Sequence, residues 1–310
     1  MARTWRALDG VLLFDKPLGL SSNTAMQQVR RLFQAEKAGH TGTLDPLASG
    51  LLPICFGEAT KFSMGLLDAD KTYRATIRLG QTTTTGDAEG EVLETRPVAV
   101  NEEQVQAVLA SFLGKIRQVP PMYSALKHQG KPLYDYIRDG VTIERQAREV
   151  VIYALTLDKL DGNELEFTVR CSKGTYVRTL GEDIGQKLGC GGHLSALRRI
   201  AIADFSVDQA LTLAQLEASS EAERDAAVMP VDSLLSDLPR LDLDETQAIR
   251  LGRGQKLGMS QGLVVGQYRL YAAGQFIGVG AWLGHGLAPS RLLSSLAKQA
   301  AQTDSTAAAS

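Results

Sequence analysis

Apolar and polar residues follow each other along the chain in two patterns, one typical of strands and one typical of helices. Residues 10–14 form a short apolar run, which predicts a buried strand that ends at Asp15-Lys16-Pro17. Three candidate N-cap residues at 21–23 then precede a helix. Apolar residues at helical spacing give that helix one buried face: Met26, Val29, Leu32 and Phe33.

Two later segments, residues 73–79 and 165–171, alternate apolar and polar positions and predict half-buried strands. Between them, Asn101 caps a helix that stops at Gly114, and another helix begins near Thr175. Strands and helices therefore follow no strict alternation, which argues against a doubly wound fold. We expect an α+β fold whose mixed, largely antiparallel sheet is flanked by helices.

Changes in composition along the chain indicate two domains and a tail. Residues 120–150 are polar, basic and rich in tyrosine, which predicts an excursion from the sheet. We place the domain boundary at Pro239, so that a large domain spans 1–239 and a small β-rich domain with glycine-broken strands spans 240–295. Residues 296–310 are rich in alanine, serine and threonine, which predicts a disordered tail.

The composition is that of an ordinary soluble globular protein, because 44% of the 310 residues are hydrophobic and 22% are charged. We expect no membrane span and no signal peptide, since no run approaches the roughly 18 apolar residues that cross a bilayer. The three cysteines are scattered, so we expect a reduced, cytoplasmic compartment. Cys190 and His193 have the C-x-x-H spacing of metal ligands, but no second pair completes a zinc site.

The net charge of −2 argues against a strongly basic nucleic-acid binder, yet the charges are unevenly distributed. Residues 115–148 hold seven Lys or Arg against three acidic residues, a local balance of +4. Residues 213–246 hold nine acidic residues against two arginines, a local balance of −7. The basic region is either a patch that binds a polyanion or a solvated face.

The segment Gly39-His40-Thr41-Gly42-Thr43-Leu44-Asp45-Pro46 is the strongest candidate for chemistry. Its two glycines permit tight backbone turns, and Pro46 holds Asp45 in an extended or turn conformation. A carboxylate on such a loop can serve as a nucleophile, as a general base, or as a turn residue that bonds its own backbone. A phosphotransferase aspartate is disfavoured, because the acid there precedes the threonine run.

Two further residues have both a structural and a functional interpretation. Tyr73 is either a buried sheet tyrosine or an aromatic platform on which a base stacks. Arg178 lies where a loop runs into a helix, and a positive charge in the first turns of a helix is electrostatically unfavourable. We therefore expect Arg178 to have a carboxylate partner.

Six segments, taken together and in order, resemble one family, the TruB-type tRNA pseudouridine synthases, which make pseudouridine 55 in the T arm. These segments are residues 10–17, 39–48, 71–74, 121–127, 171–179 and 192–199. One such motif alone would be weak, whereas six in the family's order are specific. The small C-terminal domain is similar to the family's PUA-type RNA-binding domain, although that match is diffuse.

The resemblance implies an isomerase that detaches uracil from its ribose, rotates it and rejoins it through C5, with neither a cofactor nor a metal. It implies that Asp45 is the nucleophile, that Arg178 pairs with Asp45, and that Tyr73 stacks on the uracil and assists removal of the C5 proton. A phenol has a pKa of about 10, so we expect stacking to matter more than proton transfer. Asp45 must be ionised and desolvated whether it attacks the ribose, attacks the ring or deprotonates the sugar.

The implied substrate-binding residues are His40, Tyr176, Leu197, Lys16, Lys127 and Lys131. Among these, His40 would contact RNA beside the flipped nucleotide, and Tyr176 and Leu197 would line the uracil pocket. Lys16 belongs to the N-terminal motif. Lys127 and Lys131 would bind phosphate oxygens from a thumb-like insertion.

The implied partner is the T arm of tRNA, from which the target uridine must leave its stack to reach Asp45. We expect a monomer, because no large apolar surface stripe is evident. Two other functions stay open at this point. A tRNA-folding chaperone would use the same basic surface without Asp45, and a nucleoside hydrolase or glycosylase would release free base.

Overall fold

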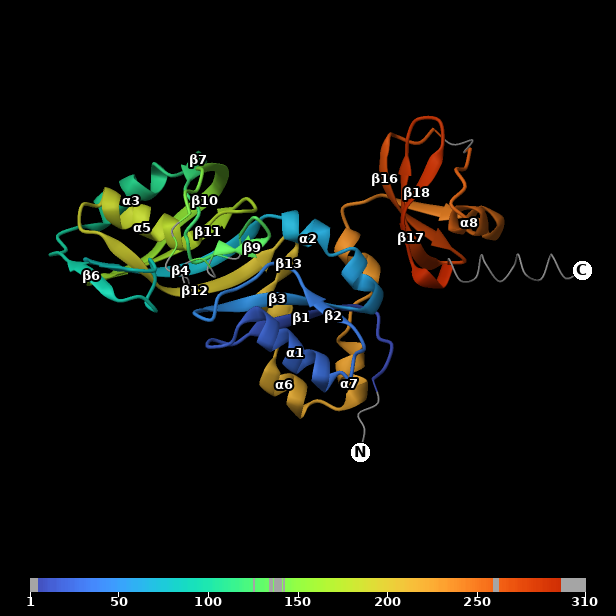
Figure 1. Ribbon diagram of the computed structural model, residues 1–310, viewed down its shortest axis with the longest axis horizontal. Helices are drawn as coiled ribbons and strands as arrows, with labels where there is room; N and C mark the ends of the chain where they lie inside the picture. The colour runs from blue at the N-terminus through green and yellow to red at the C-terminus, as the bar shows by residue number, and fades with distance from the viewer. Residues whose placement is uncertain are drawn as a thin grey trace, which may run out of the picture.

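The computed structural model of the protein describes residues 5–124, 126–133, 136, 141, 143–258 and 262–296. Figure 1 shows a long twisted sheet with helices packed on it, and a smaller β-rich unit near the C-terminus. Helices and strands are interspersed along the described chain without a strict β–α alternation. This arrangement confirms the expected α+β class.

Among the described residues, the large sheet has ten strands. In chain order they are β1 (Gly10–Lys16), β2 (Ala38–His40), β3 (Ala48–Phe56), β4 (Lys71–Leu79), β7 (Gly114–Gln118), β10 (Arg148–Asp161), β11 (Glu164–Cys171), β12 (Gly192–Ile202), β13 (Phe205–Ser206) and β14 (Leu211–Thr212). Their spatial order is β14-β1-β3-β12-β4-β11-β10-β7, with β2 beside β3 and β13 beside β12. The parallel pairs in this sheet are β1 with β14 and β3 with β12, so the sheet is mixed and largely antiparallel, as expected.

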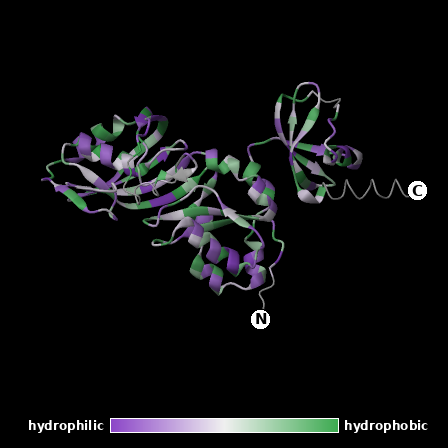
Figure 2. Ribbon diagram, viewed as in Figure 1, coloured by the Kyte–Doolittle hydropathy of each residue, from purple (hydrophilic) through white to green (hydrophobic). Residues whose placement is uncertain are grey.

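Helices cover different parts of this sheet. They are α1 (Ser22–Leu32), α2 (Met64–Asp68), α3 (Glu102–Ala110), α5 (Val177–Lys187), α6 (Leu213–Ala218) and α7 (Glu221–Ala226), with the 3-10 helices η1 (Gly57–Lys61), η2 (Val207–Gln209) and η3 (Val231–Leu235). Helices α3 and α5 pack on β4, β10 and β11, whereas α1 and α6 pack on β1 and β3. Figure 2 shows both hydrophilic and hydrophobic residues on α1, as expected of a helix that buries one face only.

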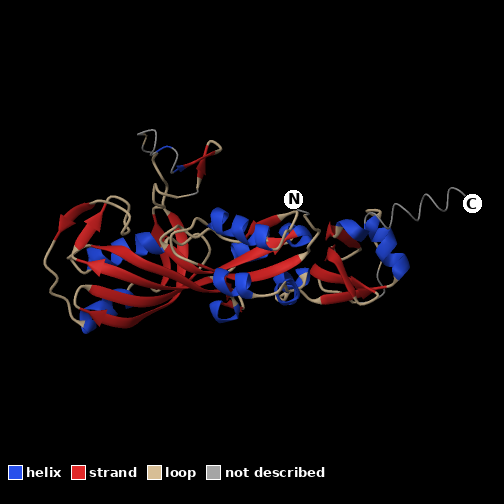
Figure 3. Ribbon diagram, turned by 90° about the horizontal axis from the view of Figure 1, so that it is seen from below, coloured by secondary structure: helices blue, strands red, loops and turns tan. Residues whose placement is uncertain are grey.

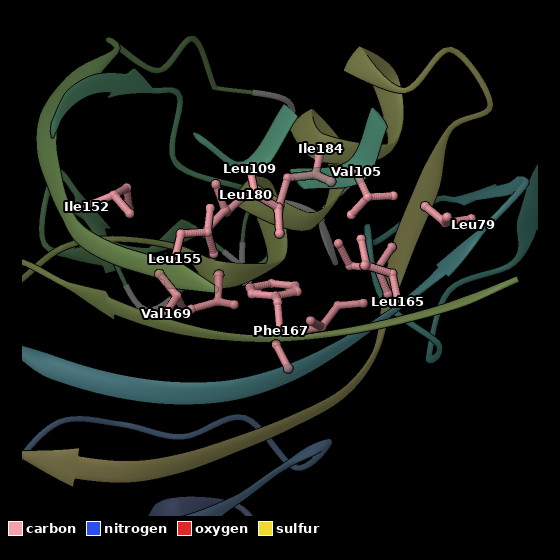
Figure 4. Packing of buried hydrophobic residues seen from close by; sticks show 14 of the residues in the cluster. Leu79, Val105, Leu109, Ile152, Leu155, Leu165, Phe167, Val169, Leu180 and Ile184 are labelled. Carbon is pink, nitrogen blue, oxygen red and sulfur yellow. The ribbon is translucent and has the colours of Figure 1, made fainter. Parts of the chain in front are cut away.

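The apolar core accordingly has separate centres along the sheet. In the core under α3 and α5, Phe167 and Val169 of β11 lie with Leu180 and Ile184 of α5 (Figure 4). The core under α1 contains residues of β1 and β3 instead. Two half-buried side chains, Tyr73 and Leu197, pack against both cores. Because these two side chains at the boundary between the cores are only half-buried, a pocket can open there.

Several local predictions are confirmed by the helix and strand ends. The Ser21 side chain caps α1 by accepting from Thr24 N at 3.1 Å, and Asn101 caps α3 by accepting from Gln104 N at 2.9 Å. Along β4, the alternate residues Ala75, Ile77 and Leu79 are buried, as the apolar pattern predicts. The pattern extends one residue too far at Phe33, which is the C-cap of α1.

The C-terminal unit is a separate four-stranded sheet against helix α8 (Glu245–Gly252). Its strands are β15 (Arg240–Leu243), β16 (Gly266–Ala272), β17 (Gln275–Trp282) and β18 (Leu287–Leu292). Phe276 of β17 reaches the large unit, where its ring centroid lies 5.5 Å from that of Phe62. Lys61 Nζ donates to Ser294 Oγ at 2.7 Å across the same boundary. The two units are thus joined by both apolar and polar contacts.

Two short hairpins stand beside the large sheet. The first pairs β5 (Gln81–Thr83) with β6 (Val92–Thr95), and the second pairs β8 (Lys127–His128) with β9 (Lys131–Pro132). In Figure 3 the β8–β9 hairpin projects away from the sheet, where the sequence predicts an excursion. The side chains of Lys127 and Lys131 lie outside the described residues, and so does nearly all of the predicted tail at 296–310.

The described part of the chain contains no helix that is both long enough and apolar enough to cross a membrane.

Candidate active site

The loop that carries Asp45 is fixed by the first turn of helix α1. It connects β2 to β3, and Gly42 adopts a left-handed φ of +74° that favours glycine. The buried Ser22 hydroxyl lies 2.9 Å from Leu44 O and accepts from Leu44 N at 2.7 Å. Leu44 is therefore buried in the α1 core, and the next residue, Asp45, is left at the surface of the sheet with a side chain that is 52% exposed.

Arg178, in the first turn of α5, lies between two carboxylates. Its Nη2 donates to Asp45 Oδ2, and its Nε lies 2.9 Å from Asp87 Oδ2. Its Nη1 also faces two backbone carbonyls, those of Thr85 at 3.4 Å and Tyr123 at 3.3 Å. The guanidinium is only 10% exposed. It forms one ion pair with Asp45 and a second with Asp87, so Asp87 fixes the side chain that positions Asp45.

Asp87 is a site residue that the sequence reasoning missed. Its side chain is 3% exposed and accepts from Thr85 Oγ1 at 2.5 Å and from Glu89 N at 3.1 Å. In the sequence it lies in the polar segment Thr82-Thr83-Thr84-Thr85-Gly86-Asp87, which is typical of an exposed turn. The packing of this loop against α5 and its backbone hydrogen bonds to Leu194 of β12 bury it, so no local pattern gives a signal.

A pocket of about 190 Å³ opens beside Asp45 at the boundary between the two cores. Its walls come from the loop that carries Asp45, from β4, from β12 and from the start of α5. The residues that line it include Asp45, Tyr73, Tyr176, Val177, Arg178, Leu194 and Leu197. Mostly apolar walls with a few convergent polar groups are typical of a small-molecule or base pocket. The structure thus brings together Asp45, Tyr73, Arg178, Tyr176 and Leu197.

A larger cleft of about 570 Å³ also borders Asp45 and Arg178. The N-terminal end of α1, His40 and Asp87 contribute to its walls. His40, on β2, is half-buried and has an Nδ1 without a hydrogen-bond partner among the described residues. Burial lowers the pKa of His40, and the charge of Arg199 lowers it further, so this imidazole is neutral at pH 7.

Tyr73 lies at the centre of the sheet, on β4 between β11 and β12. Burial raises the pKa of Tyr73, an effect that the nearby Arg199 guanidinium opposes. Burial likewise raises the pKa of Tyr176 at the pocket wall. Both phenols are therefore protonated at neutral pH, which fits an aromatic pocket wall better than a proton acceptor.

Lys16 does not face the pocket. Its side chain is fully buried, and its Nζ donates to Pro17 O at 2.8 Å and to Leu20 O at 2.7 Å. Burial lowers the pKa of Lys16 to about 8, although Asp45 acts in the opposite direction. A direct contact between Lys16 and a substrate stays a prediction, and this burial weighs against it.

The described residues contain no group of three or more His, Cys, Asp or Glu side chains that could hold a metal ion. Cys190 and His193, which have a metal-like spacing, are both buried. His193 Nδ1 lies 3.0 Å from Gln81 O.

Three family descriptions match the chain in succession. Residues 30–177 match "TruB family pseudouridylate synthase (N terminal domain)". Residues 178–236 match "tRNA pseudouridylate synthase B C-terminal domain", and residues 239–293 match "Pseudouridine synthase II TruB, C-terminal". Together these matches cover both structural units.

Full-length relatives agree with these matches. The chain is 56% identical over 293 residues to tRNA pseudouridine synthase B of Methylobacillus flagellatus, across 94% of this chain and 97% of that protein. It is 57% identical over 300 residues to tRNA pseudouridine synthase B of Burkholderia mallei, across 94% and 99% of the two chains.

Solved structures show the same fold at lower identity. A chain of a Cbf5-Nop10-Gar1 complex superimposes with a TM-score of 0.70 at 25% identity, over 91% of this chain and 84% of that one. A chain from an H/ACA RNP bound to a substrate RNA superimposes with a TM-score of 0.69 at 23% identity, over 91% and 84%. The large mixed sheet and the β-rich C-terminal unit are thus a known combination.

Proposed function

The chain belongs to the TruB family of pseudouridylate synthases and is a tRNA-modifying isomerase; on this premise we propose that it converts uridine 55 in the T loop of tRNA to pseudouridine. We propose also that Asp45 is the nucleophile. The observation that supports this most directly is the convergence of Asp45, Tyr73 and Arg178, from three distant parts of the chain, on one small pocket.

In this reaction the bond between ribose C1′ and uracil N1 breaks, and a bond between C1′ and C5 forms. N1 gains a proton and C5 loses one, so the reaction needs no oxidant, reductant or co-substrate. An aspartate is ionised at neutral pH, and the guanidinium of Arg178 gives that charge a fixed partner and direction. An ionised Asp45 is required whether it attacks the ribose, attacks the ring or removes a sugar proton.

The bound nucleotide completes the site. Without RNA, the Asp45 side chain is 52% exposed, so water solvates the carboxylate that must react. A uridine flipped into the 190 Å³ pocket would lie on Tyr73 and cover Asp45, which replaces water by fixed protein groups. Removing the base from its stack costs a few kcal/mol, which contacts with the pocket and the RNA backbone must offset.

Tyr73 acts in this proposal as a stacking wall. Burial raises the pKa of its phenol, which makes the phenol a poor acceptor for the C5 proton at neutral pH. Tyr176 and Leu197 form the remaining pocket walls, and His40 contacts RNA from the adjacent cleft.

Binding of the T arm extends beyond the pocket. We assign it to the insertion at 120–150, whose β8–β9 hairpin carries Lys127 and Lys131, and to a PUA-like RNA-binding domain at 240–295. The catalytic domain then spans 1–239. We propose a cytoplasmic monomer that binds tRNA and can also assist tRNA folding, a role that does not need Asp45.

The test is to incubate the protein with a tRNA transcript that carries tritium at uridine C5. We expect the label in water, with the nucleotide retained as pseudouridine at position 55. Free uracil would instead identify a hydrolase. Binding without either product would leave only the chaperone role, which refolding assays with misfolded tRNA would then measure in Asp45→Asn protein.

A further inference from the structure

Arg199 is a fully buried guanidinium that the mechanism above does not use. It lies on β12 with a relative exposure of 1%, two residues after Leu197, which lines the pocket. No carboxylate in the described ranges lies within salt-bridge distance of it. Its chain neighbour Arg198 differs on both counts, because its side chain is 39% exposed and its Nη2 lies 2.6 Å from Asp15 Oδ2.

The Arg199 guanidinium contacts three separate segments of the site. Its Nε donates to Leu51 O of β3 at 2.8 Å, and its Nη2 donates to Gly42 O of the Asp45 loop at 2.9 Å. It also lies beside Tyr73, its register partner where β12 pairs with β4, and the Tyr73 hydroxyl is close enough to affect the pKa of Arg199. One side chain therefore links the loop of the proposed nucleophile to the aromatic wall of the pocket.

The backbone around Arg199 is built for this close approach. Gly50 of β3 has a φ of +102°, and a Cβ at that position would overlap the backbone carbonyl of Arg199. A Cβ on Gly42 would lie 3.3 Å from Arg199 Nη1. Gly50 thus lets β3 approach the backbone of β12 at Arg199, and Gly42 leaves room for the end of the guanidinium beside the loop.

Burying a charge without an opposite charge is costly, and an apolar side chain of similar size would often serve stability as well or better. Burial lowers the pKa values of Lys16 and Lys71, and the positive charge of Arg199 lowers them further. A side chain that is unfavourable for its neighbours in this way is a candidate for a role beyond folding.

We propose that Arg199 is a positioning residue that holds the Asp45 loop and the Tyr73 phenol in one fixed arrangement around the bound base. This proposal rests on the proposed function of the pocket. A guanidinium can only donate hydrogen bonds, so the Tyr73 oxygen is the acceptor in their contact.

The experiment reports on Tyr73 directly. A 3-fluorotyrosine installed at position 73 gives a single ¹⁹F resonance, which is followed through a pH titration in Arg199→Gln and Arg199→Lys proteins. We expect Arg199→Gln to shift the resonance and to move its titration to higher pH, because the opposing positive charge is lost. Arg198→Gln is the matched control on the same strand and should leave both unchanged.

The same Arg199 variants are then tested with C5-tritiated tRNA in single turnover. We expect the rate on bound tRNA to fall by about 100-fold while the Kd for tRNA stays within about 3-fold, because misplaced reacting groups affect the transition state more than binding. Arg199→Lys should recover part of the rate. An unchanged ¹⁹F titration, or equal losses in rate and Kd, would overturn the proposal.

Two controls keep the outcomes distinct. If neither Arg199 variant folds, as judged by circular dichroism, Arg199 is a folding residue and the proposal is wrong. If wild-type protein releases no tritium, the proposed function fails, but the ¹⁹F titration still shows whether Arg199 holds Tyr73.

Discussion

Among single side chains, Arg178 makes the most important contacts of the candidate site. Its guanidinium contacts Asp45 at the pocket and Asp87 in the interior, so each carboxylate depends on the other through it. Removing one partner of a buried ion pair costs more than the pair contributes, because the remaining charge is left uncompensated. Asp87 therefore influences Asp45 without touching the pocket that the base enters.

Replacing Asp87 with asparagine tests this chain of contacts. We expect Asp87→Asn to keep its hydrogen bonds within the loop but to release Arg178, which lowers the single-turnover rate by about 100-fold. The Kd for tRNA should change by less than about 3-fold, since Asp87 is buried. Glu91→Gln, an exposed charge change in the same segment, is the control, and a rate equally lowered in both variants would contradict the expectation.

Helices and strands position the site through a few hydrogen bonds. The clearest example is the first turn of α1. Ser22 contacts both backbone groups of Leu44, so the helix and the loop that carries Asp45 move together. Lys16 acts in the same region, because its buried ammonium holds the carbonyls of residues 17 and 20. The loop is thus supported from the N-terminal strand and helix rather than by its own sequence.

Ser22→Ala removes both contacts to Leu44. We expect the free energy of unfolding to fall by about 1–3 kcal/mol, because a buried N–H and a buried C=O lose their partners. Amide exchange should rise in residues 41–47 and stay unchanged in α5. Ser21→Ala, which removes the exposed cap of the same helix, serves as comparison. Equal exchange in the 41–47 loop of both variants would contradict the assigned role of Ser22.

The sequence predicts the elements better than it predicts their contacts. The alternation in 73–79 and the caps at Ser21 and Asn101 are local features, and the structure confirms them. The burial of Asp87, Arg199 and Lys16 comes from segments that meet only in the folded chain, so a local pattern does not reveal it. The sequence analysis therefore made no prediction about Asp87 or about the burial of Arg199 and Lys16.

At the level of the whole molecule, the C-terminal unit is attached to the large unit through the aromatic ring of Phe276, through apolar contacts of Val279, and through a hydrogen bond from the Tyr271 hydroxyl to Asp232. Phe276 lies 5.5 Å from Phe62 and 5.7 Å from Tyr271, between ring centroids. Ion-pair and backbone contacts around Lys61, Glu58 and Ser294 surround these rings. These boundary residues line neither of the two pockets that contain Asp45, so the boundary can affect RNA binding without affecting chemistry.

We expect Phe276→Ala to loosen the attachment of the C-terminal unit, because truncating a packed aromatic ring costs about 3–5 kcal/mol when it is fully buried and less for this half-buried one. Small-angle X-ray scattering should show a larger radius of gyration, and the Kd for tRNA should rise. The single-turnover rate on saturating tRNA should stay the same. Phe276→Leu, which keeps an apolar contact, should give a smaller change, and a lowered rate at saturation would contradict the separation of roles.

In the proposed mechanism, the Asp45 carboxylate starts the isomerisation. Its most direct test is single-turnover release of tritium from C5-labelled tRNA by Asp45→Asn protein, with tRNA binding measured in parallel. We expect the rate to fall by at least about 10⁴-fold while the Kd for tRNA stays within about 3-fold, because asparagine is similar in size but cannot act as the nucleophile. Release of tritium within about 10-fold of the wild-type rate would contradict the account.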